Sequence, residues 1–426
     1  MKVKIYIKIT FIFFLALYWS QGFTENKEQR NYPLLFGMNI GAKNYDDLQY
    51  QKDISRLNAV VLGFYRGWKG KHGQSIREAV RNIKRYNPDI LIGQYTVLNE
   101  AYSDPNNVAT QDKLSKLNHE NWWLRNSKGE KLQWSKLYST WDINITDLAQ
   151  ADKNGLRYPG WLALRDYNIY FSKVPEFDIW YFDNIFYKSR VNKADWKGTW
   201  TDISSAANDI QRAFRRAHLT EWRAARKLNE NLIQIGNIDN NLSYEEYKGK
   251  LQGAFLECLM GKKWSIGNKH GWSAVMKRYR DAINNTIAPN IVIFHICGSS
   301  SDYKLFRFSY ASSLLDNGWY SYTDEEKGYS SVPWFDEYNV KLGKPLEPPT
   351  YTADNDGTYK RRFENGMVIV NTNLLLNITT KIEPGYRRIS GEQDPQVNNG
   401  LPVNVITIRP QDGLVLIKDI PKTPTN

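Results

Sequence analysis

The 426-residue chain is poor in the residues that disulfide scaffolds and metal centres need. It has two cysteines and five histidines. A disulfide-rich fold requires more cysteines, and a metal site requires several ligands at defined spacing. We therefore expect no metal and no cofactor. Cys258 and Cys297 each lie at the end of an expected strand; buried free thiols are the favoured interpretation, and a disulfide between adjacent strand ends is the alternative. His295, inside an expected strand, is interpreted as a core residue.

The sequence also lacks the motifs of several other classes of protein. It has no glycine-rich phosphate loop and no Gly-x-Ser-x-Gly nucleophile elbow. The formal net charge is +12 at pH 7, but the basic residues are scattered and do not form the patch that nucleic-acid binding requires. We expect no nucleic-acid partner and interpret the positive charge as a solvated surface.

Long apolar runs are absent except at the amino terminus. Three lysines precede an apolar run over residues 9–19, and small residues follow at the positions before a cleavage site after Gly22. This pattern predicts a signal peptide over residues 1–22. The run is short for a membrane span, and an uncleaved anchor is the alternative. We expect a secreted or periplasmic protein that meets a membrane only if the leader is uncleaved.

Aromatic residues, in contrast, are abundant, with 15 Trp, 27 Tyr and 17 Phe. Amphipathic rings suit sites for ligands that have both polar and apolar faces, such as sugars. We expect most of these rings to fill a large core, and a few to contact a ligand.

Apolar strands alternate with amphipathic helices after the leader. Strands are expected at residues 34–39, 59–65, 90–97, 177–183, 232–238, 253–257, 290–296 and 318–322, and helices at 45–57, 75–86, 203–228, 270–283 and 303–315. Such alternation is typical of a parallel sheet. Eight strands predict an α/β fold, a (β/α)₈ TIM barrel over residues 23–344. The aromatic segment 99–158 has no clear periodicity and is predicted to be a long loop over the top of the barrel.

The pattern changes at the proline-rich segment 345–349. Short alternating runs follow at residues 359–363, 367–370, 378–382, 403–408 and 414–417, with an Asn-Gly hairpin turn at 365–366. Strands of this length and spacing are typical of a small all-β unit. We predict a C-terminal β-sandwich domain over residues 345–426.

Two of the expected strands end in a carboxylate. The run 177–182 leads into Asp183 and Asn184, and the run 253–256 leads into Glu257. The carboxyl ends of barrel strands face the active site, and glycoside hydrolysis needs two carboxyl groups. We assign Asp183 as nucleophile, held ionised by hydrogen bonds near Asn184 and Tyr181, and Glu257 as acid/base, since its apolar neighbours suit that role.

Each carboxylate also has a purely structural interpretation. Asp183 is a suitable helix N-cap, and Glu257 is a possible ion-pair partner of Lys262. Both residues are expected on the same face of the barrel, however, and that placement favours catalysis.

Other residues near the same strand ends are candidates for substrate contact. Each candidate also has a structural interpretation. Asp239, after the fifth strand, is better suited to capping a turn, and Glu100 and Asp302, after the third and seventh strands, are equally consistent with a solvated surface. Tryptophans are more often found in packing than stacked on sugars. The candidates are Arg66, Glu100, Trp141, Tyr181, Asn184, Asp239, Trp264 and Asp302, with Trp122 and Trp123 as further possible platforms.

Residues 180–184, 334–345 and 365–371 resemble the hypothetical glycosyl hydrolases, and most closely the fifteenth family of that series. The resemblance spans most of the chain after the leader, although its motifs are loose. It implies a TIM-barrel glycosidase distantly similar to α-galactosidases and α-amylases. In those relatives an aspartate after strand four is the nucleophile, which implies this role for Asp183. The α-galactosidase branch has its acid/base after strand six, where this chain has Glu257 in place of Asp.

Together these observations predict an exported, monomeric glycoside hydrolase that cleaves an oligo- or polysaccharide, with the resemblance favouring an α-linkage. A non-catalytic carbohydrate-binding barrel and a surface-anchored structural protein are the alternatives. The first would bind glycans without forming product, and the second would remain on the membrane without affinity for sugars.

Overall fold

The computed structural model describes residues 30–41, 44–239 and 241–419. The predicted leader lies outside these residues. Within the described part of the chain, no helix has the length and apolar character needed to span a bilayer.

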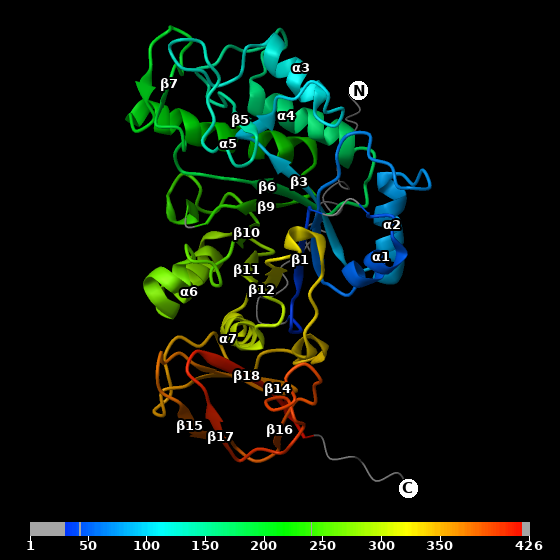
Figure 1. Cartoon of the computed structure of the whole chain (residues 1–426), viewed down its shortest axis with the longest axis vertical. Helices are drawn as coiled ribbons and strands as arrows, with labels where there is room; N and C mark the ends of the chain where they lie inside the picture. Colours follow the sequence, from blue (N-terminus) through cyan, green and yellow to red (C-terminus); the bar gives the residue numbers. More distant parts are fainter. Residues whose placement is uncertain (1–29, 42–43, 240, 420–426) are drawn as a thin grey trace, which may run out of the picture.

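Eight parallel strands form a barrel at the centre of the molecule (Figure 1). Their spatial order is β1 (Phe36–Asn39), β2 (Ala59–Leu62), β3 (Leu91–Val97), β6 (Ile179–Asp183), β9 (Ile233–Asn237), β10 (Gly253–Leu256), β11 (Ile291–Gly298) and β12 (Trp319–Asp324). A parallel bridge between Leu35 and Tyr320 joins the last strand to the first, and the Tyr320 N–H donates to the Leu34 carbonyl at 2.9 Å. The predicted (β/α)₈ architecture is confirmed.

The strands are apolar on both faces because both faces are covered. In β6, for example, Tyr181 points into the barrel interior, whereas Trp180 and Phe182 belong to the layer beneath the helices. The interior core is filled by Phe36, Met38, Ala59, Val61, Ile179, Tyr181, Ile235, Phe255, Ile291, Ile293 and Trp319. It is a packed core, and a ligand therefore has to bind at an end of the barrel.

The helices around the barrel begin and end close to the expected positions. They are α1 (Leu48–Ser55), α2 (Ile76–Tyr86), α5 (Asn208–Leu228), α6 (Ile266–Asn285) and α7 (Tyr303–Leu314). A capping box formed by Ser75 and Glu78 fixes the start of α2. The helix expected from residue 203 begins later, because Ile203 pairs with Ala194 in a short hairpin between β7 (Lys193–Ala194) and β8 (Ile203–Ser204).

Two insertions rise above the barrel, and we call them the β3 excursion (residues 98–157) and the β6 excursion (residues 184–207). The β3 excursion contains β4 (Glu100–Tyr102), α3 (Gln111–His119) and β5 (Thr140–Asp142), and leads into α4 (Tyr158–Asp166) and a π-helical turn (Tyr167–Phe171). The two excursions pack together at the top of Figure 1, and the Asn144 side-chain amide donates to the Trp196 carbonyl at 2.9 Å. The segment expected to be an irregular loop thus has regular elements and its own core. Its helices and strands are short and contain few apolar residues, so their periodicity is not visible in the sequence.

The C-terminal region is all-β, as predicted. β13 (Tyr359–Phe363), β14 (Gly366–Asn371), β18 (Asp412–Lys418) and β16 (Tyr386–Arg388) form an antiparallel sheet in that order, and β15 (Ile378–Lys381) pairs with β17 (Val405–Ile408). Inward residues of both sheets share one core, which includes Met367, Ile406 and Leu414.

This β unit is joined to the barrel by buried charges. Arg307 of α7 is 1% exposed and donates to both carboxylate oxygens of Asp412 at 3.1 and 3.2 Å and to Asp394 at 2.7 Å. Arg361 of β13 donates to the backbone carbonyls of Leu314 and Asp316 at 3.1 and 2.8 Å. Removing one partner of such a buried pair typically costs about 3–5 kcal/mol, so the orientation of the β unit against α7 is strongly fixed.

Candidate active site

Asp183 and Glu257 meet at the carboxyl ends of the barrel strands. Asp183 is the last residue of β6, Glu257 follows β10, and Asn237 ends β9, which lies between them in the sheet. The Asn237 side-chain nitrogen donates to Asp183 Oδ1 at 3.0 Å and to Glu257 Oε2 at 2.9 Å. An amide nitrogen carries two hydrogens, so it serves each carboxylate with one. The two acids therefore face one site.

The bridging amide also limits how far apart the carboxylates are. Their nearest oxygens are closer than the combined length of the two hydrogen bonds, 3.0 and 2.9 Å. Retaining glycosidases hold their carboxyl groups about 5–5.5 Å apart, and inverting ones about 6.5–9.5 Å apart. The spacing in this site fits the retaining arrangement better than the inverting one.

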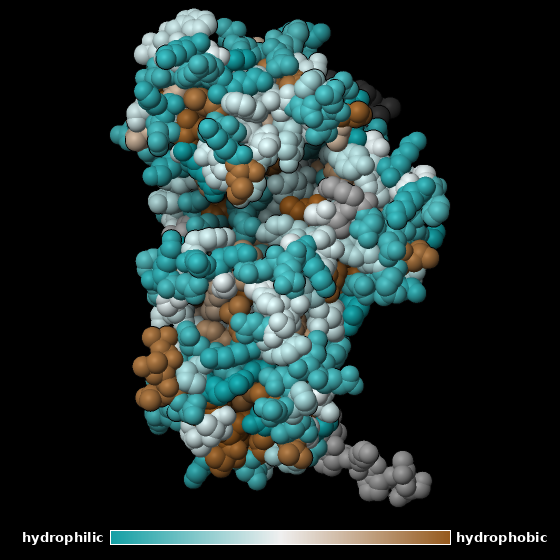
Figure 2. All heavy atoms as spheres, in the orientation of Figure 1, coloured by the Kyte–Doolittle hydropathy of each residue, from teal (hydrophilic) through white to brown (hydrophobic). Residues whose placement is uncertain are grey.

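Two tyrosines complete the hydrogen bonds of the pair. The Tyr95 hydroxyl, from β3, donates to Asp183 Oδ2 at 2.5 Å, and the Tyr329 hydroxyl, from a turn after β12, donates to Glu257 Oε1. The acids, the amide and both tyrosines are all partly exposed, although β6 and β10, which lead to the two acids, are buried up to that point. The space-filling view is hollowed where the ribbon view labels β6 and β9 (Figures 1 and 2).

Burial outweighs the hydrogen bonds of Asp183. Burial, followed by the negative charge of Glu257, raises the pKa of Asp183 to about 6, against the opposing effect of the donors Tyr95, Asn237 and the Asn184 backbone. Asp183 thus accepts hydrogen bonds, as expected, but its side-chain donors are Tyr95 and Asn237 and not Tyr181, and the net shift of its pKa is upward. Since Tyr95 and Asn237 both donate to this side chain, the ionised form is the one that the surroundings satisfy.

Glu100 connects the β3 excursion to the residue after Asp183. Its carboxylate is buried and accepts from Trp134 Nε1 at 2.6 Å, from Thr140 Oγ1 at 2.9 Å and from Asn184 Nδ2 at 3.3 Å. Asn184 has a left-handed φ of 54°, and its carbonyl accepts from Asn99 Nδ2 at 2.5 Å. Glu100 and Asn184 thus lie beside the acid pair, where they hold the rim of the site in place.

Arg190 of the β6 excursion brings positive charge to the same rim. Its guanidinium lies over the rings of Phe186 and Trp134, 3.7 and 4.2 Å from their centroids. Burial lowers its pKa, while the charges of Glu100, Asp183 and Glu257 act in the opposite direction. The group balances part of the negative charge of the acids.

The other candidates for substrate contact lie in the barrel interior beneath the acid pair, in the core of the β3 excursion, or on the outer surface. Tyr181 is 1% exposed and stacks on Tyr95 inside the barrel, with ring centroids 5.9 Å apart. Trp141 packs against the core of the β3 excursion, as do the buried Trp122 and Trp123.

Three further candidates lie on the outer surface. Arg66 pairs with Asp112 at 3.8 Å, and Asp239 pairs with Arg278 at 2.5 Å. Trp264 is exposed in the turn before α6. In the described part of the chain, the side chains that hydrogen-bond Asp183 and Glu257 are Tyr95, Asn237 and Tyr329, and none of these three candidates is among them.

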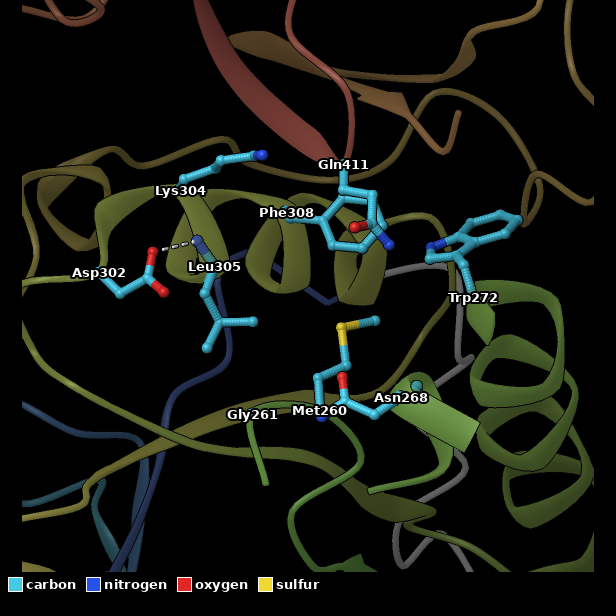
Figure 3. A pocket seen from close by; sticks show the side chains of 10 residues that line it. Met260, Gly261, Asn268, Trp272, Asp302, Lys304, Leu305, Phe308 and Gln411 are labelled. Carbon is cyan, nitrogen blue, oxygen red and sulfur yellow. Dashed lines mark hydrogen bonds between the residues drawn. The ribbon is translucent and has the colours of Figure 1, made fainter. Parts of the chain in front are cut away.

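Asp302 belongs to a different cavity. It caps α7 by accepting from the Leu305 N–H at 2.9 Å, and it lines a space of about 300 Å³ together with Met260, Trp272 and Gln411 (Figure 3). This space lies between α6, α7 and the β unit, and its lining does not include the acid pair.

The two cysteines form a disulfide directly beside Glu257. Cys258 follows Glu257, and it is bonded to Cys297 of β11 with 5.0 Å between the Cα atoms. The favoured interpretation as free thiols was wrong, because β10 and β11 are neighbours and their ends meet. His295 is fully buried, as expected, and accepts from the Cys258 N–H at 3.1 Å, while its other ring nitrogen bonds Thr323 Oγ1 at 2.8 Å.

The disulfide anchors the turn that carries Glu257. The Leu259 N–H donates to the His295 carbonyl at 2.9 Å, and the Cys297 N–H donates to the Met260 carbonyl at 3.3 Å. Cys258, His295 and Cys297 bring potential metal ligands within 4.8 Å of one another. Both sulfurs are consumed by the disulfide, however, so this cluster does not offer the thiolates that a metal would bind.

Four residues of the site were not predicted from the sequence. Asn237 ends an expected strand and carries a polar side chain, the same signal that identified Asp183. Tyr95 has a weaker signal, because tyrosine is common in strands. Tyr329 and Arg190 lie in turns that follow the strands at a distance, and no local pattern marks them.

A family model described as hypothetical glycosyl hydrolase family 15 matches residues 84–367. No curated protein matches the chain. Among solved structures, the glycoside hydrolase domain of PelA from Pseudomonas aeruginosa is similar at 11% identity and a TM-score of 0.42, with 72% of this chain and 98% of that one covered.

Two larger enzymes are also similar. The GH36 α-galactosidase AgaA from Geobacillus stearothermophilus has 11% identity and a TM-score of 0.42, with 92% of this chain and 56% of that one covered. The cycloalternan-forming enzyme from Listeria monocytogenes has 10% identity and a TM-score of 0.47, with 92% and 42% covered. The chain thus spans about half the length of these two enzymes.

The disulfide is expected to stabilise the fold. It closes a loop with a sequence separation of 39 residues, and such cross-links typically contribute about 2–4 kcal/mol by restricting the unfolded chain. The double variant Cys258→Ala, Cys297→Ala should lose that much free energy of unfolding in urea. A reducing agent should destabilise the native protein similarly and leave the variant unchanged. Equal stability of the two proteins without reductant would contradict this expectation.

Proposed function

The chain belongs to hypothetical glycosyl hydrolase family 15, and from this premise we propose that it hydrolyses an oligo- or polysaccharide with Asp183 as nucleophile and Glu257 as acid/base. The single observation that supports this assignment most is the Asn237 amide, which donates to both carboxylates. This shared donor holds the two carboxylates at a spacing at which both can act on one glycosidic bond.

In the first step, Asp183 attacks the anomeric carbon while Glu257 gives its proton to the departing glycosidic oxygen. The bond between the anomeric carbon and that oxygen breaks, and a covalent glycosyl ester forms on Asp183. The resemblance implies the nucleophilic role for the aspartate at the end of the fourth barrel strand, and the donors around Asp183 satisfy the ionised form that this role needs.

In the second step, Glu257 accepts a proton from water, and the resulting oxygen attacks the same carbon. The ester bond breaks, Asp183 leaves as a carboxylate, and Glu257 is again protonated. Two displacements at one carbon retain its configuration. We therefore propose a retaining enzyme, and the resemblance to α-galactosidases favours an α-linked substrate.

The roles of the two acids can be separated by substitution. Asp183→Asn and Glu257→Gln should each lower kcat on a nitrophenyl glycoside by about 10²–10⁴-fold or more, with circular dichroism unchanged. A dinitrophenyl leaving group needs no proton, so it should restore much of kcat/KM, which reports the first step, to Glu257→Gln and none to Asp183→Asn.

The matched control is Glu176→Gln, which removes a carboxylate at the opposite end of β6, where it pairs with Arg77. It should keep native activity. If the dinitrophenyl substrate rescued Asp183→Asn instead, the two roles would be reversed. If wild-type protein bound glycans but formed no product from any substrate, the non-catalytic barrel would be the better description.

The rate should fall in acid because Asp183 must be ionised to attack. Its pKa of about 6 means that kcat/KM should decline as the pH drops through that value. Tyr95→Phe removes a donor that stabilises the ionised form of Asp183, so the acid limb of the pH profile of kcat/KM should move to higher pH in the variant. A profile that is flat down to pH 4, or a limb that Tyr95→Phe leaves in place, would contradict the assignment.

We further propose that the protein is exported. The support is the leader over residues 1–22, which lies outside the described residues. When the full chain is expressed in a bacterial host, sequencing of the exported protein should give an amino terminus at Phe23. Recovery of only the uncut chain in the membrane fraction would favour the anchored alternative.

A further inference from the structure

A second cavity lies where the two excursions meet. It has a volume of about 200 Å³, and its lining includes Asn121, Arg125, Gln150, Asp195, Trp196 and Trp200. Neither acid nor any of their hydrogen-bond partners belongs to the lining. The cavity is therefore distinct from the candidate active site, although the same excursions form both.

Trp200 is held at the edge of this cavity in an unfavourable backbone conformation. Its φ is 60°, in the left-handed region that bulky residues avoid, and the residue is 72% exposed. Burial of a large apolar ring could offset the cost of this backbone strain, but the Trp200 ring is mostly exposed and gains little from burial. Strain of this kind persists where the surroundings impose it, and it is concentrated at ligand-binding sites.

Asp195 imposes the conformation of Trp200. Its carboxylate accepts from the Thr199 N–H at 2.9 Å and from the Trp200 N–H at 2.7 Å, and its own N–H donates to the Arg125 carbonyl at 2.8 Å. The β6 excursion is thus fastened to the β3 excursion at the point where the tryptophan projects. A Trp ring on such a fixed turn loses little entropy when a ligand stacks on it.

The ring is also supported from one side. Gly129 has a φ of 82°, and a Cβ atom at that position would lie 3.3 Å from the Trp200 ring. Glycine therefore lets the turn of the β3 excursion approach the indole closely. With this contact beneath it and most of its surface exposed, the ring offers a flat apolar platform.

The cavity beside the platform is polar but nearly neutral. Among its lining residues, Glu120 and Asp195 oppose Arg125 and Lys197, and Asn and Gln amides supply further donors and acceptors. The indole N–H of Trp196 is buried without a hydrogen-bond partner. An anionic ligand would find no excess of positive charge here, whereas a neutral ligand rich in hydroxyl groups would find partners beside an aromatic face.

We propose that Trp200 and this cavity form a second carbohydrate-binding site, which holds a part of a polysaccharide chain away from the acid pair. Sugar rings have an apolar face that stacks on indole and hydroxyl groups that bond planar amides and guanidinium groups. The proposal rests on the proposed function for its ligand class, a neutral polysaccharide, but it does not depend on turnover.

Binding can be measured without hydrolysis in the full chain that carries Asp183→Asn. Native affinity electrophoresis in gels with galactomannan, dextran, soluble starch or xylan would report retardation by each polymer. We expect at least one polymer to retard the protein, and Trp200→Ala to weaken that binding by about tenfold, the loss typical of an aromatic anchor. Trp200→Phe should restore part of it.

Tyr86→Ala is the matched control, because it removes an exposed ring at the end of α2, outside the cavity. It should bind as the parent does. In the active enzyme, Trp200→Ala should raise KM for the retarding polymer and leave kcat/KM for a nitrophenyl glycoside unchanged.

The outcomes separate this inference from the catalytic proposal. If none of the four polymers retards the parent, or if Trp200→Ala binds as tightly as Tyr86→Ala, the second site does not exist. If Trp200-dependent binding is found but wild-type protein cleaves nothing, the site stands and the catalytic proposal fails.

Discussion

The site depends on one amide group that serves two acids. Asp183 and Glu257 are like charges in a partly buried setting, and without donors between them their repulsion would force one to stay protonated or to turn away. The Asn237 side chain places a hydrogen on each. This is possible because the barrel order sets β9 between β6 and β10, so that three strand ends converge. Closure of the barrel, through the bridge between Leu35 and Tyr320, keeps that convergence in place.

The remaining parts of the molecule hold this triplet from outside. Tyr95 and Tyr329 come from strands or turns on either side and complete the hydrogen bonds of the acids. Glu100 fastens the β3 excursion to Asn184. The disulfide at Cys258 fixes the turn directly after Glu257 on β11. Each acid thus has a rigid attachment of its own, which limits the reorganisation that charge development would otherwise require.

Much of the architecture was predictable because buried parallel strands are short apolar runs, and because strand ends in a barrel share one face. That logic found Asp183 and Glu257. It passed over Asn237 and considered Asp239, two residues later, although that residue turns outward to Arg278. Asp239 lies beyond the end of β9 and has a left-handed φ of 49°, so the alternation of side chains along a strand does not fix the direction in which its side chain points. Tyr329 and the disulfide depend on contacts between distant segments, which no local pattern encodes.

The buried Arg307 cluster has a consequence for how the molecule moves. Its guanidinium is fixed to Asp394 and Asp412 on the β unit, while its helix packs on the barrel. Many appended β modules swing on flexible tethers and sample a wide volume of solution. This one is braced against the helix that follows β11, so the two parts should tumble as a single elongated body. Whatever the β unit touches, it would reach at a fixed angle to the mouth of the barrel.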